Sequence, residues 1–241
     1  MHMRIIFIFG LLLMLGVATP AVSMDIRIQE WKFDKDAPGS IPVGFVPGKL
    51  NSEAGHWQVA NDPKAPSAPK VLVWQGTDQA AKDQIIFIEG LEAGSLDLTL
   101  RIKSATASEG QGAGVVFRAI DERNYYLIWL SPQEKLLRLD KVVNGTVTHL
   151  QDLTLDAVEP GKWHTLRILI HGPLMEAIFN NRQFMSGREE AWAFGTYKKG
   201  KIGLLAKGDG PMYFDTVRYT DMDDSTASNG PFGAESVAPR K

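Results

Sequence analysis

The chain has 241 residues, with 26 Lys and Arg against 28 Asp and Glu, which leaves a formal net charge of −2. It contains no cysteine, so disulfide bonds, thiolate metal sites and cysteine nucleophiles are excluded. The near-neutral charge gives no electrostatic reason to expect a nucleic acid as partner, because phosphate neutralisation needs a concentrated excess of Lys and Arg. The length suits one large domain or two small ones.

The first 23 residues have the pattern of a secretory signal peptide. A basic start with His2 and Arg4 is followed by the apolar run 5–17 and by small residues at 21–23. The run is shorter than the roughly 20 apolar residues that a membrane anchor needs. We therefore predict cleavage, with no membrane attachment afterwards. Because an exported protein without cysteine is typical of bacteria, the sequence predicts a secreted or periplasmic bacterial protein.

From residue 25 to residue 220 the dominant period is two residues, as in β-strands. Strand-like segments at 70–75 and 84–88 follow a proline-rich loop at 63–69. The segment 95–103, SLDLTLRIK, then alternates cleanly between apolar and polar residues. That alternation predicts a strand with one face in the core.

Two hairpins are predicted next. The segments 114–120 and 125–130 are separated by a short polar turn, so they should pair antiparallel. The segments 136–143 and 146–150 are joined by Asn144-Gly145, the strongest short hairpin signal.

The remaining segments complete an all-β chain. No stretch is long enough for a substantial amphipathic helix, so sheet must pack on sheet, and a jelly-roll β-sandwich follows. We predict one domain over residues 25–220 and a disordered tail over 221–241, which is polar and rich in small residues. The further predicted strands are 163–170, 175–180, 183–185, 201–206 and 212–220.

Five segments carry a family resemblance. They are GVVFRAIDERNYYL from Gly114, LRLDKVVNG from Leu137, GKWHTLR from Gly161, KIGL from Lys201 and YFDTVR from Tyr213. Their order resembles the bacterial concanavalin A-like jelly rolls, which include laminin-G-like domains and the related 3-keto-disaccharide (3-keto-glycoside) hydrolase-like domains. The resemblance covers roughly residues 29–219. It implies two curved antiparallel sheets, with a carbohydrate on the concave face in many relatives.

Strand alternation suggests which side chains would meet such a ligand. If Tyr126 and Ile128 face the core, Tyr125 and Trp129 lie on the opposite face. A sugar offers an apolar C–H face to an aromatic ring and hydroxyls to planar charged groups. The alternative is that Trp129 is a core residue and the arginines form a solvated strand face. The candidate ligand contacts are Arg118, Tyr125, Trp129, Arg138, Asp140 and Arg167.

The resemblance also implies a structural calcium ion that ties the first strand to the last. Calcium prefers six to eight oxygen ligands. Asp34, in the segment Trp31-Lys-Phe-Asp, and Asp215, in Tyr213-Phe-Asp-Thr, occupy positions that resemble its ligands. The alternative is a turn or edge position with solvated carboxylates. No other cofactor is expected.

No catalytic motif stands out. The Glu-x-Asp-x-x-Glu motif of retaining glucanases on this fold is absent. Elimination from a 3-keto-glycoside would need a base for the C2 proton and an acid for the leaving group. Asp140 and His171, with Asp97 and Glu176, are the candidates, but their spacing singles out no pair.

The sequence therefore predicts an exported domain that binds a glycan or glycoside on the concave face of a sheet. A hydrolase or lyase acting on 3-keto-glycosides and a laminin-G-like protein-interaction domain remain as alternatives.

Overall fold

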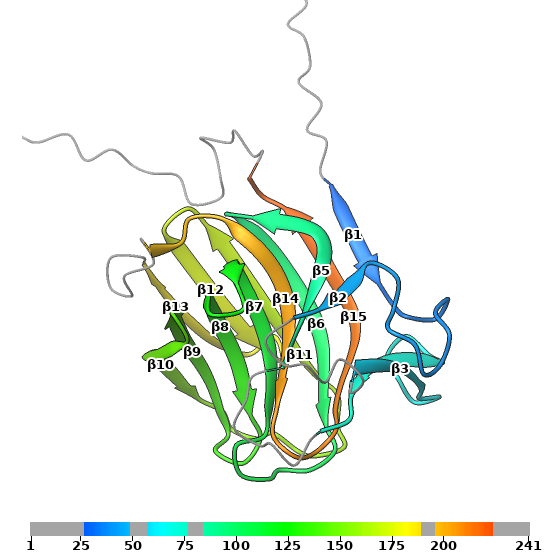
Figure 1. The fold of residues 1–241 in the computed structure, drawn as a ribbon. Coiled ribbons are helices and arrows are strands. Elements are labelled where there is room, and N and C mark those ends of the chain that lie inside the picture. Colours follow the sequence, from blue (N-terminus) through cyan, green and yellow to red (C-terminus); the bar gives the residue numbers. More distant parts are fainter. Residues whose placement is uncertain (1–26, 49–56, 77–83, 189–195, 224–241) are drawn as a thin grey trace, which may run out of the picture.

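The structure, a computed structural model, describes residues 27–48, 57–76, 84–188 and 196–223. The predicted signal peptide lies outside these residues. Within them, no helix is long and apolar enough to cross a membrane. The described chain folds into two antiparallel β-sheets that pack face to face (Figure 1).

The first sheet, called sheet A, has the strand order β13-β12-β11-β6-β15-β4-β3, and β1 also pairs with β15. The first strand of the domain therefore lies beside the last. The strands are β1 (Ile28–Trp31), β3 (Trp57–Asn61), β4 (Lys70–Trp74), β6 (Leu96–Ser104), β11 (His164–His171), β12 (Leu174–Phe179), β13 (Gln183–Arg188) and β15 (Met212–Asp221).

The second sheet, called sheet B, has the strand order β10-β9-β8-β7-β14-β5-β2. Consecutive hairpins join β7 to β8, β8 to β9 and β9 to β10. The strands are β2 (Phe45–Pro47), β5 (Gln84–Ala93), β7 (Gly112–Asp121), β8 (Asn124–Ser131), β9 (Leu136–Val143), β10 (Thr146–Thr154) and β14 (Gly200–Lys207).

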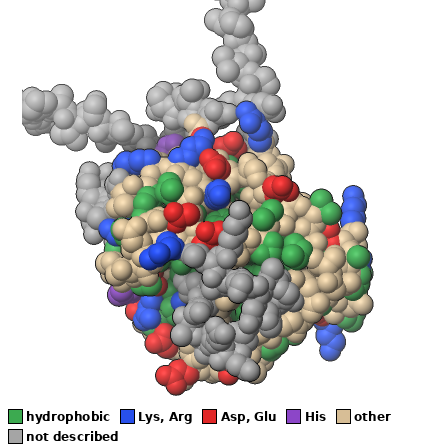
Figure 2. Space-filling model, viewed as in Figure 1, with side chains coloured by type: hydrophobic (Ala, Val, Ile, Leu, Met, Phe, Trp, Pro, Cys, Tyr) green, Lys and Arg blue, Asp and Glu red, His purple; other side chains and the backbone are tan. Residues whose placement is uncertain are grey.

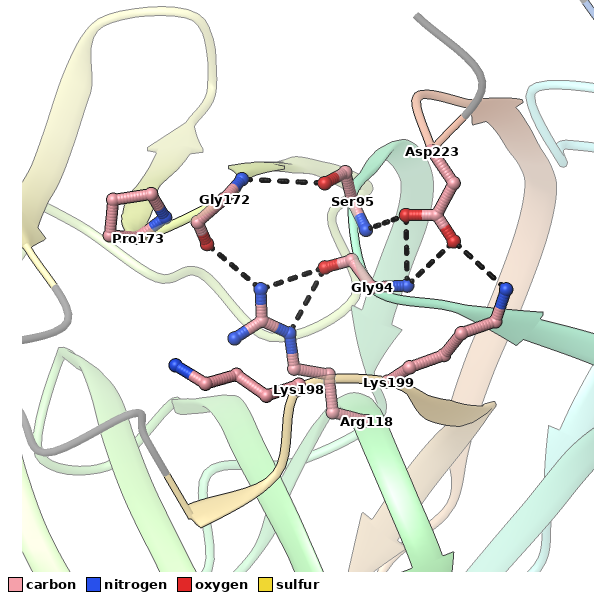
Figure 3. A pocket seen from close by; sticks show the side chains of 8 residues that line it. All are labelled: Gly94, Ser95, Arg118, Gly172, Pro173, Lys198, Lys199 and Asp223. Carbon is pink, nitrogen blue, oxygen red and sulfur yellow. Dashed lines mark hydrogen bonds and ion pairs between the residues drawn. The ribbon is translucent and has the colours of Figure 1, made fainter.

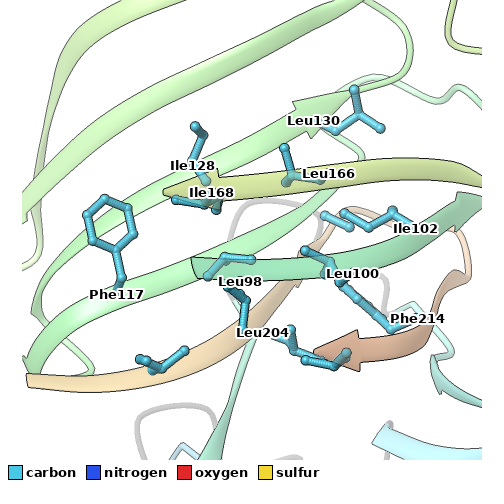
Figure 4. Close-up of a cluster of buried hydrophobic side chains, with 14 of the residues drawn as sticks. Leu98, Leu100, Ile102, Phe117, Ile128, Leu130, Leu166, Ile168, Leu204 and Phe214 are labelled. Carbon is cyan, nitrogen blue, oxygen red and sulfur yellow. The ribbon is translucent and has the colours of Figure 1, made fainter. Parts of the chain in front are cut away.

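The main core lies between the sheets and is built from alternate residues of each strand. On β6 the buried and half-buried residues alternate without a break from Leu96 to Ser104. Leu98 and Leu100 meet Phe117 and Ile128 of sheet B, and all four are fully buried (Figure 4). Each such side chain contributes about 1.5–3 kcal/mol through burial. Sheet-on-sheet packing thus replaces the missing helical layer.

The predicted fold class, an all-β jelly-roll sandwich, is confirmed. Both predicted hairpins form, and Asn144 and Gly145 have φ angles of 51° and 82°, as a two-residue hairpin turn requires. The strands β2 and β3 were not predicted, because they are too short to show a clear alternation.

The predicted start of the tail, residue 221, falls inside the described domain. β15 includes Asp221, and the carboxylate of Asp223 accepts hydrogen bonds from the backbone of Gly94 and Ser95. Residues 224–241 lie outside the described residues.

Candidate functional site

The face of sheet B that points away from the main core carries a second buried apolar cluster. We call it the outer cluster. The outward face of sheet A differs, since the residues of β6 on that face are polar and only half-buried. Charged side chains of both signs lie among apolar ones on the side of the molecule shown in Figure 2. The outer cluster consists of Ile85, Phe87, Val116, Ala119, Tyr125, Leu127, Trp129, Val142 and Leu205.

Trp129 belongs to this cluster, and its indole ring lies against the backbone of β7. It pairs with Gly114 on β7, and a Cβ added to Gly114 would lie 2.0 Å from the carbonyl oxygen of Ile128. A Cβ on Gly112 would lie 2.5 Å from Cε3 of Trp129. The indole ring therefore rests directly on the β7 backbone, where only glycine leaves room.

Two cations approach the Trp129 ring. The ammonium of Lys207 lies 3.6 Å from the ring centroid, and the guanidinium carbon of Arg138 lies 5.6 Å from it. Both distances are within the range of cation–π attraction. Trp129 is only 6% exposed, so its buried ring lies beneath these two cations.

A buried carboxylate binds the N–H group at the edge of the indole. Asp140 is 4% exposed, and its Oδ2 accepts a hydrogen bond of 2.8 Å from Nε1 of Trp129. Its Oδ1 lies 3.1 Å from Nδ1 of His149, the residue directly opposite on β10. His149 is half-exposed, and its Nε2 lies 3.6 Å from Oδ1 of Asp152. Asp140 thus joins a buried indole to an imidazole at the surface.

Arg138 and Asp152 complete the group of charged residues. Arg138 donates to both carboxylate oxygens of Asp152, at 2.8 and 3.0 Å, in a bidentate pair. This hydrogen bonding lowers the pKa of Asp152 and raises that of Arg138. We call Trp129, Arg138, Asp140, His149, Asp152 and Lys207 the Trp129 group.

The structure brings four of the six predicted ligand contacts to the outer face of sheet B. Tyr125, Trp129, Arg138 and Asp140 lie there, with the paired positions Trp129 and Arg138 side by side on β8 and β9. Tyr125 is 3% exposed and belongs to the outer cluster.

The expectation that Arg118 shares this face is wrong. Arg118 has a φ of 49° at a register shift in β7, which breaks the strand alternation there. Its side chain is 3% exposed and donates to the carbonyl oxygens of Gly94 and Gly172 at the end of the sandwich.

Arg167 is also wrongly placed by the prediction, because it lies in the other sheet. It sits on β11 of sheet A and forms a bidentate pair with Asp97, with contacts of 2.9 and 2.6 Å. His171 ends the same strand and is exposed, whereas Asp140 lies on β9 of sheet B. The two catalytic candidates are therefore not together; the imidazole next to Asp140 belongs to His149, which the sequence analysis missed.

Asp34 and Asp215, the predicted calcium ligands, do lie close together. Ser67 joins them, because its amide donates to Oδ2 of Asp215 at 2.6 Å and its hydroxyl to Oδ2 of Asp34 at 3.2 Å. Asp215 is fully buried at a register shift in β15. Burial, with a contribution from the negative charge of Asp34, raises the pKa of Asp215.

The two described carboxylates supply only part of the six to eight oxygens that calcium prefers, so the calcium site stays a prediction. No group of three or more acidic or histidine side chains gathers anywhere in the described chain. The carbonyl oxygens of Asp34 and Asp36 accept hydrogen bonds of 2.9 and 2.6 Å from the ammonium of Lys70. Lys70 already supplies a positive charge at this point.

A family model of the 3-keto-alpha-glucoside-1,2-lyase-like domain matches residues 43–220. No curated protein matches the sequence.

Solved structures share the fold at low sequence identity. A carbohydrate binding module, CBM66 from Bacillus subtilis, superimposes with a TM-score of 0.55 at 16% identity, over 73% of this chain and 94% of that chain. A family 16 enzyme of the Bacteroides ovatus mixed linkage glucan locus, in complex with G4G4G3G product, gives 0.59 at 12% identity, over 79% and 99%. Domain 4 of AbnA, an extracellular arabinanase from Geobacillus stearothermophilus, in complex with arabinotriose, gives 0.53 at 14% identity, over 80% and 90%.

Replacing Lys70 by Met tests whether its ammonium holds the loop after β1. We expect a loss of about 1–3 kcal/mol in the free energy of unfolding, because two carbonyl oxygens lose their charged donor. Lys64→Met, at an exposed position, is the matched control.

We also expect the melting temperature of the wild-type protein to be unchanged by EDTA. A fall with EDTA that calcium reverses would contradict this interpretation and restore the calcium clamp at Asp34 and Asp215.

Proposed function

The chain belongs to the family of the 3-keto-alpha-glucoside-1,2-lyase-like domain, and we propose that it is an exported domain that binds a glycan or glycoside on the outer face of sheet B. The observation that carries the proposal is the Trp129 group. It combines an aromatic ring, two cations and a buried carboxylate within one connected set of contacts.

This combination suits a sugar. A pyranose presents an apolar C–H face that packs on an indole, and its hydroxyls both donate and accept hydrogen bonds. Arg138 and Lys207 supply donors at the rim, and Asp152 supplies an acceptor. Lys207 covers the ring, so the sugar reaches Trp129 when the flexible lysine stem swings aside. A nearly neutral net charge is compatible with an uncharged ligand.

The relatives support the same ligand class. One similar structure is a carbohydrate binding module, and two others were determined with a bound oligosaccharide. Export is supported by the signal-peptide pattern of residues 1–23 and by the extracellular location stated for AbnA. A laminin-G-like protein-interaction domain is the outcome that remains if no sugar binds.

Trp129→Ala should weaken glycan binding at least tenfold, about 1.4 kcal/mol, because the floor of the site is removed. Affinity is measured by calorimetry on a panel of cellobiose, maltose, laminaribiose and arabinotriose. Trp163→Ala is the matched control, because Trp163, directly before β11, also has a lysine ammonium near its ring: that of Lys103 lies 4.7 Å from the ring centroid. Unchanged affinity in Trp129→Ala, or an equal loss in both variants, would contradict the proposal.

A second candidate function is elimination from a 3-keto-glycoside, favoured by the pairing of His149 with Asp140. In the tautomer that carries its proton on Nδ1 and donates it to Asp140, His149 has an unprotonated Nε2 that can act as a base. The carboxylate would hold the imidazole in that tautomer and stabilise its protonated form. Lys207 could then stabilise negative charge on the keto oxygen.

The elimination needs no oxidant, because the substrate already carries the C3 ketone. Nε2 of His149 takes the C2 proton, and the C2–H electron pair becomes the C1–C2 double bond. The C1–O bond breaks, and the leaving oxygen takes a proton from solvent to release the alcohol. The products are an unsaturated keto-sugar and the aglycone.

His149→Gln should lower aglycone release from a 3-keto-glucoside by about 10²–10⁴-fold, the usual contribution of a general base. Sugar affinity should change little, because the Trp129 ring and Arg138 remain. His171→Gln on sheet A is the matched control. If His149→Gln retains the wild-type rate, the catalytic assignment is wrong. If the wild-type protein binds the substrate without turnover, the binding function stands alone.

A further inference from the structure

A separate pocket lies where several turns meet at one end of the sandwich. Its volume is about 530 Å³, within the range of small-molecule sites. The turn between β5 and β6, the turn between β11 and β12, the segment before β14 and the residues after β15 all contribute to it (Figure 3). It is lined by Gly94, Ser95, Arg118, Gly172, Pro173, Lys198, Lys199 and Asp223.

The chain's own Asp223 carboxylate is bound in this pocket as an anion. The backbone amide of Gly94 donates to both of its oxygens, at 3.1 and 3.0 Å, and the amide of Ser95 donates to Oδ1. The ammonium of Lys199 lies 3.2 Å from Oδ2. Burial alone would raise the pKa of Asp223, but the two amides and Lys199 outweigh it and lower the pKa. This arrangement of donors favours a carboxylate.

The binding of the Asp223 carboxylate depends on a close approach of the backbone at Gly94. A Cβ added there would lie 2.8 Å from the carbonyl oxygen of Lys198 and 3.2 Å from Oδ1 of Asp223. Glycine therefore leaves the space into which the anion fits.

Arg118 holds the surrounding turns in place. Its Nε and one terminal nitrogen donate to the carbonyl oxygen of Gly94, at 3.0 and 2.8 Å, and that terminal nitrogen also donates to the carbonyl oxygen of Gly172 at 2.9 Å. The amide of Gly172 in turn donates to the hydroxyl of Ser95 at 3.3 Å. Figure 3 shows the guanidinium spanning the two turns. The amides that bind Asp223 thus belong to a turn that Arg118 holds in place.

The lining carries more positive than negative charge. Arg118, Lys198 and Lys199 surround a single carboxylate, that of Asp223. The Trp129 group contributes none of these residues, so the pocket belongs to a different site. We propose that it is a second binding site, for the carboxylate of a small organic acid, and that Asp223 is an internal occupant that such a ligand displaces.

Displacement sets the strength of binding. A side chain tethered a few residues from β15 competes at an effective concentration in the millimolar range or above. Competition by Asp223 therefore lowers the affinity of the wild-type pocket for a free carboxylate. Removal of the Asp223 carboxylate should raise this affinity. The glucuronate ion is a suitable probe because it differs from glucose by its carboxylate.

The test is a titration of Asp223→Ala and the wild-type protein with D-glucuronate, with the backbone amides of Gly94 and Ser95 followed by NMR. We expect a saturable shift of both amides in Asp223→Ala, at least tenfold tighter than in wild type and weakened by salt. D-Glucose should cause no shift. Asp209→Ala, at an exposed acidic residue, is the matched control and should behave as wild type.

Three results would overturn the proposal. They are the absence of a saturable shift in Asp223→Ala, an equal response to glucose, and an equal affinity in wild type and Asp223→Ala. If Asp223→Ala does not fold, Asp223→Asn keeps the shape and one acceptor while removing the charge, and the same outcomes apply to it. Unchanged binding of neutral sugars at Trp129 would separate this result from the function proposed above.

Discussion

The alternation of side chains along β8 is the constraint on which the candidate site depends. Tyr126, Ile128 and Leu130 fill the core between the sheets, so Trp129 must point outward. A slip of one residue would move all three onto the outer face and bring Tyr125, Leu127 and Trp129 into the core, so the packing on both faces of β8 would be lost. The position of Trp129 is therefore as firmly fixed as the core itself.

The two sheets use their outward faces differently. Sheet A presents a solvated face on which Arg167 pairs with Asp97, and such exposed pairs contribute little stability. Sheet B instead buries apolar side chains on its outward face and places Asp140 against the indole of Trp129. A buried carboxylate without full solvation is costly, so its retention beside a half-exposed histidine is more easily explained by function than by stability.

The sequence predicted those parts of the site that follow from the alternation of side chains between the two faces of a strand. It placed Trp129, Arg138 and Asp140 on one face. It could also have found His149, because the two-residue turn at Asn144-Gly145 sets position 149 opposite position 140. Arg118 was not predictable, since its φ of 49° breaks the alternation. The error at Arg167 has another cause: alternation gives the face of a strand but not the sheet to which it belongs.

The most direct test of sugar binding at Trp129 is an NMR titration that follows the indole N–H signals. The indole of Trp129 donates to Asp140, so its signal reports on both residues. With the disaccharide panel and arabinotriose, the account predicts a saturable shift of the Trp129 indole signal while that of Trp163, directly before β11, stays in place. A shift of Trp163 without Trp129, or no shift of either with any of these sugars, would contradict it.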